Sequence, residues 1–272
     1  MDLRRPEFLY NRYCYEVFEN RMSGRIDILG VAVDDFTFDE AISGILKLAE
    51  RKNRGSYVVT VNSEFVIMAR RNREFARILA GADLALADGK WVVFSKLILG
   101  GRAHDRITGV DLVEKLCARC AKKPIRIGFL GGFTHVAKTL AKRQKSLNPN
   151  LKVVFAEAGD PAIGYDLRLK SQLNRFGRVD ILFVAYGMGK QEKWVQRMKS
   201  LDVGVFIGVG GAFDYLADVK RRAPKLWQVW GMEWLWRLIL EPARIWRMRV
   251  LPAFFVLVLG QFIKKQFLSS SN

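Results

Sequence analysis

The residue best placed for acid–base chemistry is Asp88. It closes the apolar run Asp83-Leu-Ala-Leu-Ala-Asp88 and precedes Gly89. A carboxylate at the end of a buried strand suits a general base, although an aspartate in front of a helix is also typical of an N-cap. The two histidines, His104 and His135, are predicted in a polar loop and at a helix start. We therefore expect a carboxylate, rather than a histidine, to transfer protons.

Two glycine turns are the second feature with chemical meaning. Gly187-Met-Gly189-Lys-Gln-Glu192 and Gly208-Val-Gly210-Gly211-Ala-Phe213 approach the dinucleotide fingerprint, but Glu and Phe replace its third glycine. Clustered backbone N–H groups at a helix start still favour phosphate. The chain has no GxxxxGK[ST] motif and no Asp-x-Asp metal clamp. These patterns exclude P-loop hydrolysis and disfavour a nucleotide-dependent oxidoreductase. The negative charge of any bound diphosphate would have to be compensated by Arg, Lys and backbone amides.

The elements that must position these residues are short β-branched runs alternating with helical patterns such as 38–52 and 109–122. The runs are Ile26–Val33, Tyr57–Val61, Leu84–Ala87, Ile125–Leu130, Val153–Ala156, Ile181–Ala185 and Val205–Val209. This alternation predicts a Rossmann-like α/β fold, with a mostly parallel sheet flanked by helices. Ligands of such sheets bind outside the carboxyl ends of the strands. The polar and glycine turns after the runs are therefore the predicted site.

The composition indicates a globular chain with an anionic partner. Half of the residues are hydrophobic and the formal net charge is +18, which suits phospholipid, nucleic acid or a phosphorylated substrate. Cys117 and Cys120 form a CxxC within a predicted helix, but no second pair follows, so zinc or redox use is disfavoured. Residues 1–25 contain no apolar signal segment, and we expect a cytosolic location.

The segment 219–272 differs from the rest of the chain. It holds ten Lys/Arg against two acids, a net +8, and five of the seven tryptophans. Its fourteen-residue uncharged run Val250–Ile263 would make a helix of about 21 Å, short of a hydrocarbon core of roughly 30 Å. This composition favours the lipid interface. The alternative is a helical hairpin, with Trp227, Trp230 and Trp234 packed on the domain or on another subunit.

Ordered motifs along most of the chain carry a resemblance to a known family. They are Thr60-Val-Asn62, Ala87-Asp88-Gly89, Arg106-Ile-Thr-Gly-Val-Asp111, Phe129-Leu-Gly-Gly132, Gly187-x-Gly189-Lys-Gln-Glu192-Lys-Trp194, Gly208-Val-Gly-Gly-Ala-Phe-Asp214, Arg222-Ala-Pro224, Trp227-Gln228, Gly231-x-Glu233-Trp234 and Glu241-Pro242-x-Arg244. Between about Ile26 and Arg249 the chain resembles the WecG/TagA/CpsF family of bacterial glycosyltransferases.

The resemblance implies an inverting, metal-independent transferase without a cofactor. It would move N-acetylmannosamine, its uronic acid or glucose from a UDP-sugar to a polyprenyl-diphosphate-linked sugar, in cell-surface polysaccharide or teichoic acid synthesis. It implies a base at Asp88, with Thr60, Asn62, Arg106 and Gln191 as further catalytic residues. The segments expected around the UDP-sugar contain Gly131, Gly132, Gly187, Gly210 and Asp214. For the glycines, a purely structural tight turn stays open, and for Arg106 a solvated loop charge.

The predicted organisation has three parts: an N-terminal extension (1–25), an α/β glycosyltransferase domain (26–218) and a basic, Trp-rich appendage (219–272). The appendage would associate with the cytoplasmic face of the membrane, and Arg221, Arg222 or Arg244 would bind the acceptor diphosphate. A homo-oligomer stays open. A basic module for nucleic acid is the rival hypothesis, but the positive charge lies beside tryptophans rather than on a reading element. We expect no nucleic-acid partner.

One motif departs from the family pattern. The family commonly reads Pro-Lys-Gln-Glu where this chain has Gly189-Lys-Gln-Glu192. Proline fixes φ, so its loss predicts a less rigid loop and puts the sugar preference in doubt.

Overall fold

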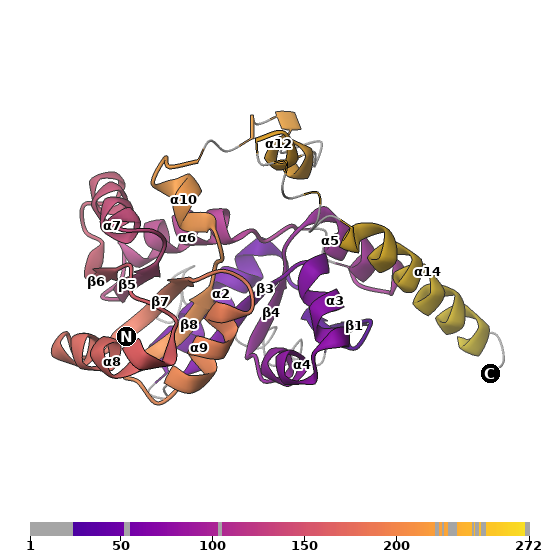
Figure 1. Cartoon of the computed structure of the whole chain (residues 1–272), viewed down its shortest axis with the longest axis horizontal. Helices are drawn as coiled ribbons and strands as arrows, with labels where there is room; N and C mark the ends of the chain where they lie inside the picture. Colours follow the sequence, from indigo (N-terminus) through magenta and orange to yellow (C-terminus); the bar gives the residue numbers. More distant parts are fainter. Residues whose placement is uncertain are drawn as a thin grey trace, which may run out of the picture.

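The computed structural model describes residues 24–51, 55–102, 105–220, 223–224, 226–227, 233–240, 242, 245 and 249–269. Its centre is a six-stranded parallel sheet with the order β4-β3-β8-β7-β5-β6 (Figure 1). The strands are β3 (Ser56–Val61), β4 (Leu84–Ala87), β5 (Arg126–Gly131), β6 (Lys152–Glu157), β7 (Val179–Ala185) and β8 (Val203–Gly208). The predicted α/β fold is therefore confirmed.

Helices cover both faces of this sheet, as a parallel sheet requires. One buried cluster joins the sheet to α2 (Phe38–Glu50), α6 (Gly109–Cys120), α7 (Val136–Leu147) and α10 (Ala212–Leu216). The cluster on the other face includes α3 (Ser63–Arg71), α4 (Arg73–Ala80), α5 (Lys90–Ile98), α8 (Asp166–Arg175) and α9 (Lys190–Met198). A short 3₁₀ helix, η1 (Ile163–Tyr165), precedes α8.

The first predicted strand is wrong in one respect. The run Ile26–Val33 is a hairpin of β1 (Arg25–Ile28) and β2 (Val31–Asp34), in a separate two-stranded sheet. The chain reverses at Leu29 and Gly30, whose φ angles are 54° and 88°. Positive φ at both central residues gives the turn whose twist matches a two-residue hairpin. The hairpin packs with the second cluster through Ile28, Val31 and Val33.

Side-chain caps start both of the helices that the sequence predicted. Thr37 and Glu40 form a capping box at α2, and Thr108 caps α6, whereas His135, with φ 74°, occupies the cap position of α7 without a side-chain hydrogen bond. The predicted helices 38–52 and 109–122 are thus present, each two residues shorter at its C-terminal end.

The C-terminal segment contains α12 (Glu233–Leu240) and α14 (Val250–Ser269). The helix α14 continues past Ile263 through two lysines, so its 20 residues span about 30 Å rather than the expected 21 Å. Within the described part of the chain, α14 is the single helix long and apolar enough, by length and composition, to cross a membrane. Figure 1 shows it starting beside α5 and extending away from the sheet.

Candidate active site

The candidate residues lie along one edge of the sheet because the strands are parallel and end together. Asp88 N–H donates to Val61 O (2.8 Å), and the Thr60 hydroxyl donates to Gly208 O (3.1 Å). At the next strands, Val209 N–H donates to Val184 O, and Gly132 N–H donates to Ala185 O. Four spacings between neighbouring strands, each of about 4.8 Å, separate β4 from β5, so the strand ends form a row roughly 19 Å long.

Asp88 follows β4 directly and is half-buried. The cap position of α5 belongs to Gly89, with φ 95° and no side-chain cap hydrogen bond. The N-cap position of α5 thus falls on Gly89 and not on Asp88. Gly89 has open space where a Cβ would stand. The backbone turns at Gly89, between Asp88 at the strand end and Lys90, the first residue of α5.

Thr60 and Asn62 lie on the neighbouring strand β3 and at its end. The Thr60 side chain is buried, and its hydroxyl joins β3 to β8 through Gly208 O. Asn62 caps α3, since its Oδ1 accepts hydrogen bonds from Glu64 N–H (2.9 Å) and Phe65 N–H (3.1 Å). Both residues thus have structural roles at this edge, next to Asp88.

Gln191 and Glu192 lie in the first turn of α9, where they contact the turns that follow β7 and β8. Gln191 is buried, and its Oε1 accepts a hydrogen bond from Gly210 N–H (3.0 Å). Glu192 is fully buried; its Oε2 accepts from Gly189 N–H (2.5 Å) and its Oε1 from the Tyr57 hydroxyl (3.4 Å). These two side chains tie the turns after β7 and β8 to each other and to β3.

Sequence reasoning noted Glu192 in place of a third glycine and as part of a family motif, but gave it no role in the site. The available signal was the spacing Gly189-x-x-Glu192, because a Glu at the third helical position reaches back to the cap N–H. Burial raises the pKa of its carboxyl to about 7, while hydrogen bonds from Gln191, Gly189 and Tyr57 oppose the rise. Gly189 has φ 83°, which proline cannot adopt. The turn therefore differs in conformation from a Pro-Lys-Gln-Glu turn, beyond any loss of rigidity.

The four glycines expected near the nucleotide fall into two pairs. Gly131 and Gly132 end β5 with φ 116° and 77°, and added Cβ atoms would meet Ala185 at 2.6 Å and Val136 at 2.9 Å. Tight packing thus explains these two. Gly187 and Gly210 also have positive φ, 82° and 54°, but face open space. No protein atom therefore fills the space where a side chain would stand at these two positions, although the Gly210 N–H is bound by Gln191. Connections from β5 and β7 run in opposite directions, so Gly131, Gly132 and Gly187 lie at a topological switch point.

Arg106 and Asp214 lie on segments that border this row. Ile107 N–H donates to Ala87 O (2.9 Å), which places the backbone of Arg106 beside the residue before Asp88. Arg106 is half-buried. Asp214, on α10, is buried and forms an ion pair with Lys220 (3.5 Å). Arg221, Arg222 and Arg244, predicted to bind the acceptor diphosphate, and His104 lie outside the described residues.

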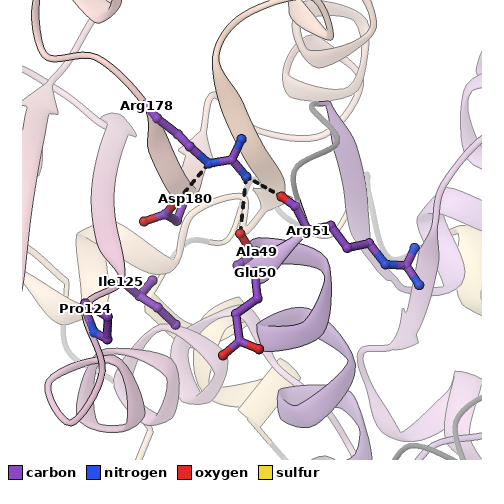
Figure 2. A pocket seen from close by; sticks show the side chains of 7 residues that line it. All are labelled: Ala49, Glu50, Arg51, Pro124, Ile125, Arg178 and Asp180. Carbon is purple, nitrogen blue, oxygen red and sulfur yellow. Dashed lines mark hydrogen bonds and ion pairs between the residues drawn. The ribbon is translucent and has the colours of Figure 1, made fainter.

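A cavity of about 350 Å³ opens at the other edge of the sheet, at the amino ends of β5 and β7 (Figure 2). Its lining is Ala49, Glu50, Arg51, Pro124, Ile125, Arg178 and Asp180. The Arg178 guanidinium donates to Ala49 O (3.3 Å), Arg51 O (2.6 Å) and Asp180 Oδ1 (3.0 Å). These contacts join the C-terminal end of α2 to β7. We therefore assign this cavity a structural role.

The CxxC cysteines lie inside the domain. Cys117 and Cys120 are buried on α6, and burial raises the pKa of both thiols, that of Cys120 to about 12. Among the residues that the structure describes, no group of three or more His, Cys, Asp or Glu side chains is arranged to hold a metal ion.

Comparison with known proteins assigns the chain to a family. The family model described as "Glycosyl transferase WecG/TagA/CpsF family" matches residues 26–267, which includes most of α14. Two relatives, from Bacillus spizizenii and Bacillus subtilis, are 31% and 32% identical over 76% of this chain and 80% of theirs. A Staphylococcus aureus relative is 26% identical over 88% of this chain and 93% of its own. All three are N-acetylglucosaminyldiphosphoundecaprenol N-acetyl-beta-D-mannosaminyltransferases. The chain is a glycosyltransferase and belongs to the WecG/TagA/CpsF family.

Proposed function

We propose that the protein transfers N-acetylmannosamine from its UDP derivative to a polyprenyl-diphosphate-linked N-acetylglucosamine, with inversion at the anomeric carbon. The names of the three relatives support this acceptor and this sugar. The reaction belongs to the synthesis of a cell-surface polymer. The observation that carries the proposal is the row of strand ends, where Asp88 and the glycine turns occupy different positions along one edge.

In the proposed mechanism, Asp88 accepts the proton of the acceptor hydroxyl. The oxygen attacks the anomeric carbon of the donor as the bond from that carbon to the UDP oxygen breaks, and UDP leaves from the opposite face. A general base of this kind contributes about 10²–10⁴-fold in rate. Negative charge grows on the diphosphate, so donors aimed at it in advance lower the barrier. The Arg106 guanidinium and the N–H groups after β7 and β8 would supply these donors.

The row of strand ends supports a division of labour between its two parts. The turns that hold Gly187 and Gly210 would receive the diphosphate, because neither is obstructed by a side chain of its glycine and backbone turns of this kind before a helix favour phosphate. The end nearer β4 would receive the reacting sugar and the acceptor hydroxyl, beside Asp88, Thr60 and Asn62. Gln191 would act through Gly210, whose N–H it binds.

The acceptor's lipid requires the site to meet a membrane. We propose that residues 26–218 form the catalytic domain and that residues 219–272 hold it at the cytoplasmic face of the membrane. The exposed apolar side chains of α14 support this assignment. Arg221, Arg222 and Arg244 remain our candidates for binding the acceptor diphosphate.

The variant Asp88→Asn tests the proposal. It should keep its unfolding midpoint and its affinity for the UDP-sugar while losing about 10²–10⁴-fold in the rate of UDP release. The assay offers a panel of UDP-sugars and a soluble analogue of the diphosphate-linked acceptor. The matched control is Asp39→Asn, which changes an exposed carboxylate on α2. Full activity of Asp88→Asn would refute the base assignment, and release of UDP only with another sugar would refute the donor.

A further inference from the structure

We infer that α5 is a second lipid-contacting helix, which together with α14 forms one apolar surface resting on the membrane. The inference deepens the proposed function, since it rests on an acceptor that is carried by a lipid. The surface, named here the α5–α14 face, consists of the exposed side chains Trp91, Phe94, Phe255, Val256, Leu259 and Ile263. The position of α5 gives this face a direct link to the chemistry, because α5 begins two residues after Asp88.

The two helices are joined at both ends of α5, and this makes their exposed sides continuous. Near its start, Trp91 and Phe255 pack edge to face with ring centroids 6.0 Å apart. At its end, Lys265 Nζ donates to Leu99 O (2.6 Å). The two contacts are eight residues apart on α5 and ten on α14, about 12 Å and 15 Å along the axes. Such matched separations mean that the helices run side by side in the same direction.

One face of the helix α14 packs against the domain, and the opposite face is exposed. Phe254 and Val258 are buried, whereas Phe255 and Leu259, one position further along, are each 44% exposed. Gln261, near the end of the uncharged run Val250–Ile263, donates to Asp27 O (2.9 Å) and accepts from Leu29 N–H (2.9 Å). These bonds hold the helix along the domain on the β1–β2 turn. A helix docked in this way lies along the lipid surface and does not cross the bilayer.

Charge identifies lipid, rather than a second copy of the chain, as the occupant of this face. Neither α5 nor α14 contains an Asp or Glu, and the exposed Lys90 and Lys264 border the apolar side chains. Basic residues around an apolar surface suit anionic headgroups. Two chains that each carry a formal +18 repel one another. Trp91 beside Lys90 is also typical of the interface between lipid and water.

The test compares Trp91→Ser/Phe94→Ser with the control Ile163→Ser/Leu167→Ser. The control side chains are also apolar and even more exposed, but lie on η1 and α8; Figure 1 shows α8 at the other end of the molecule. Each protein is sedimented with vesicles of mixed phosphatidylglycerol and phosphatidylethanolamine. We expect the first variant to partition at least about tenfold less than the parent, and the control within about twofold of it. Equal partitioning of the two variants would overturn the inference.

Two further measurements separate this inference from its alternatives. If the face joined two copies, the parent would sediment as a dimer without lipid and the Trp91/Phe94 variant as a monomer, which would also overturn it. Transfer to a soluble acceptor analogue should be unchanged in the variant, whereas transfer to acceptor in vesicles should fall together with partitioning. If neither the parent nor the Trp91/Phe94 variant transferred any sugar, the proposed function would be refuted. The partitioning into vesicles would still decide whether α5 contacts lipid.

Discussion

Replacing Glu192 by Gln should change how the stability of the protein depends on pH. The carboxyl is fully buried, and burial raises its pKa to about 7 from an ordinary value of 4.5. Between these values the group is protonated in the folded protein and ionised in the unfolded chain. The folded state therefore binds more protons, so the free energy of unfolding decreases as the pH rises through this window.

The size of the effect follows from the two pKa values. One pH unit is worth about 1.4 kcal/mol, so the interval from 4.5 to about 7 amounts to roughly 3 kcal/mol. Glutamine has the same shape and does not titrate. Relative to the parent, Glu192→Gln should thus gain roughly 3 kcal/mol between about pH 4.5 and pH 7.5. A constant offset from altered hydrogen bonds does not affect this slope.

Urea unfolding followed by far-ultraviolet circular dichroism, at a series of pH values, measures this difference. The control Glu114→Gln changes an exposed carboxylate on α6 and should follow the parent curve. Tyr57 stays protonated throughout, since burial and the neighbouring Glu192 raise its pKa well above the usual range. A difference between parent and Glu192→Gln that stays flat across the series would refute the view that the buried carboxyl is neutral in the folded protein.

Two more substitutions test the packing of the fold, both by guanidinium unfolding without lipid. Phe254→Ala should lower the free energy of unfolding by about 3–5 kcal/mol, because this side chain, 1% exposed, is buried between α14 and the domain. The control Phe267→Ala changes a side chain that is 70% exposed on the same helix, and should alter stability by less than about 0.5 kcal/mol. Equal effects of the two would mean that α14 is not docked in solution. Gly131→Ala should cost about 2 kcal/mol or more, since φ is 116° and the new Cβ would stand 2.6 Å from Ala185. Gly164→Ala, with no atom within 4 Å, is its control, and a tolerated Gly131→Ala would contradict the tight turn.

The sheet was predictable because each of its strands carries its own signal. Leu84–Ala87 is an uninterrupted apolar run, and the structure places β4 on these same residues. The polar and glycine turns after such runs had to meet at one edge once the strands were parallel. The reversal at Leu29 was not predictable in the same way, because a leucine with positive φ is uncommon and carries no turn signal.

Long-range contacts account for what the sequence did not reveal. Glu192 is buried against Tyr57, which lies 135 residues earlier in the chain, and no local pattern announces that contact. The length of α14 was underestimated because Lys264 and Lys265 continue the helix, and a count of uncharged residues stops before them. The face that α14 turns to the protein depends on Asp27 and Leu29, at the other end of the chain.

The bonds between Gln261 and Asp27, on β1, join positions 234 residues apart, with the whole six-stranded sheet between them in sequence. During synthesis the receiving surface, built from the hairpin, α3 and α5, is therefore complete before α14 emerges. The helix then covers this apolar surface by packing Phe254 and Val258 into the second buried cluster. A chain shortened before α14 would leave that surface bare and prone to aggregate. The same helix thus protects the newly made domain from its neighbours before it meets any lipid.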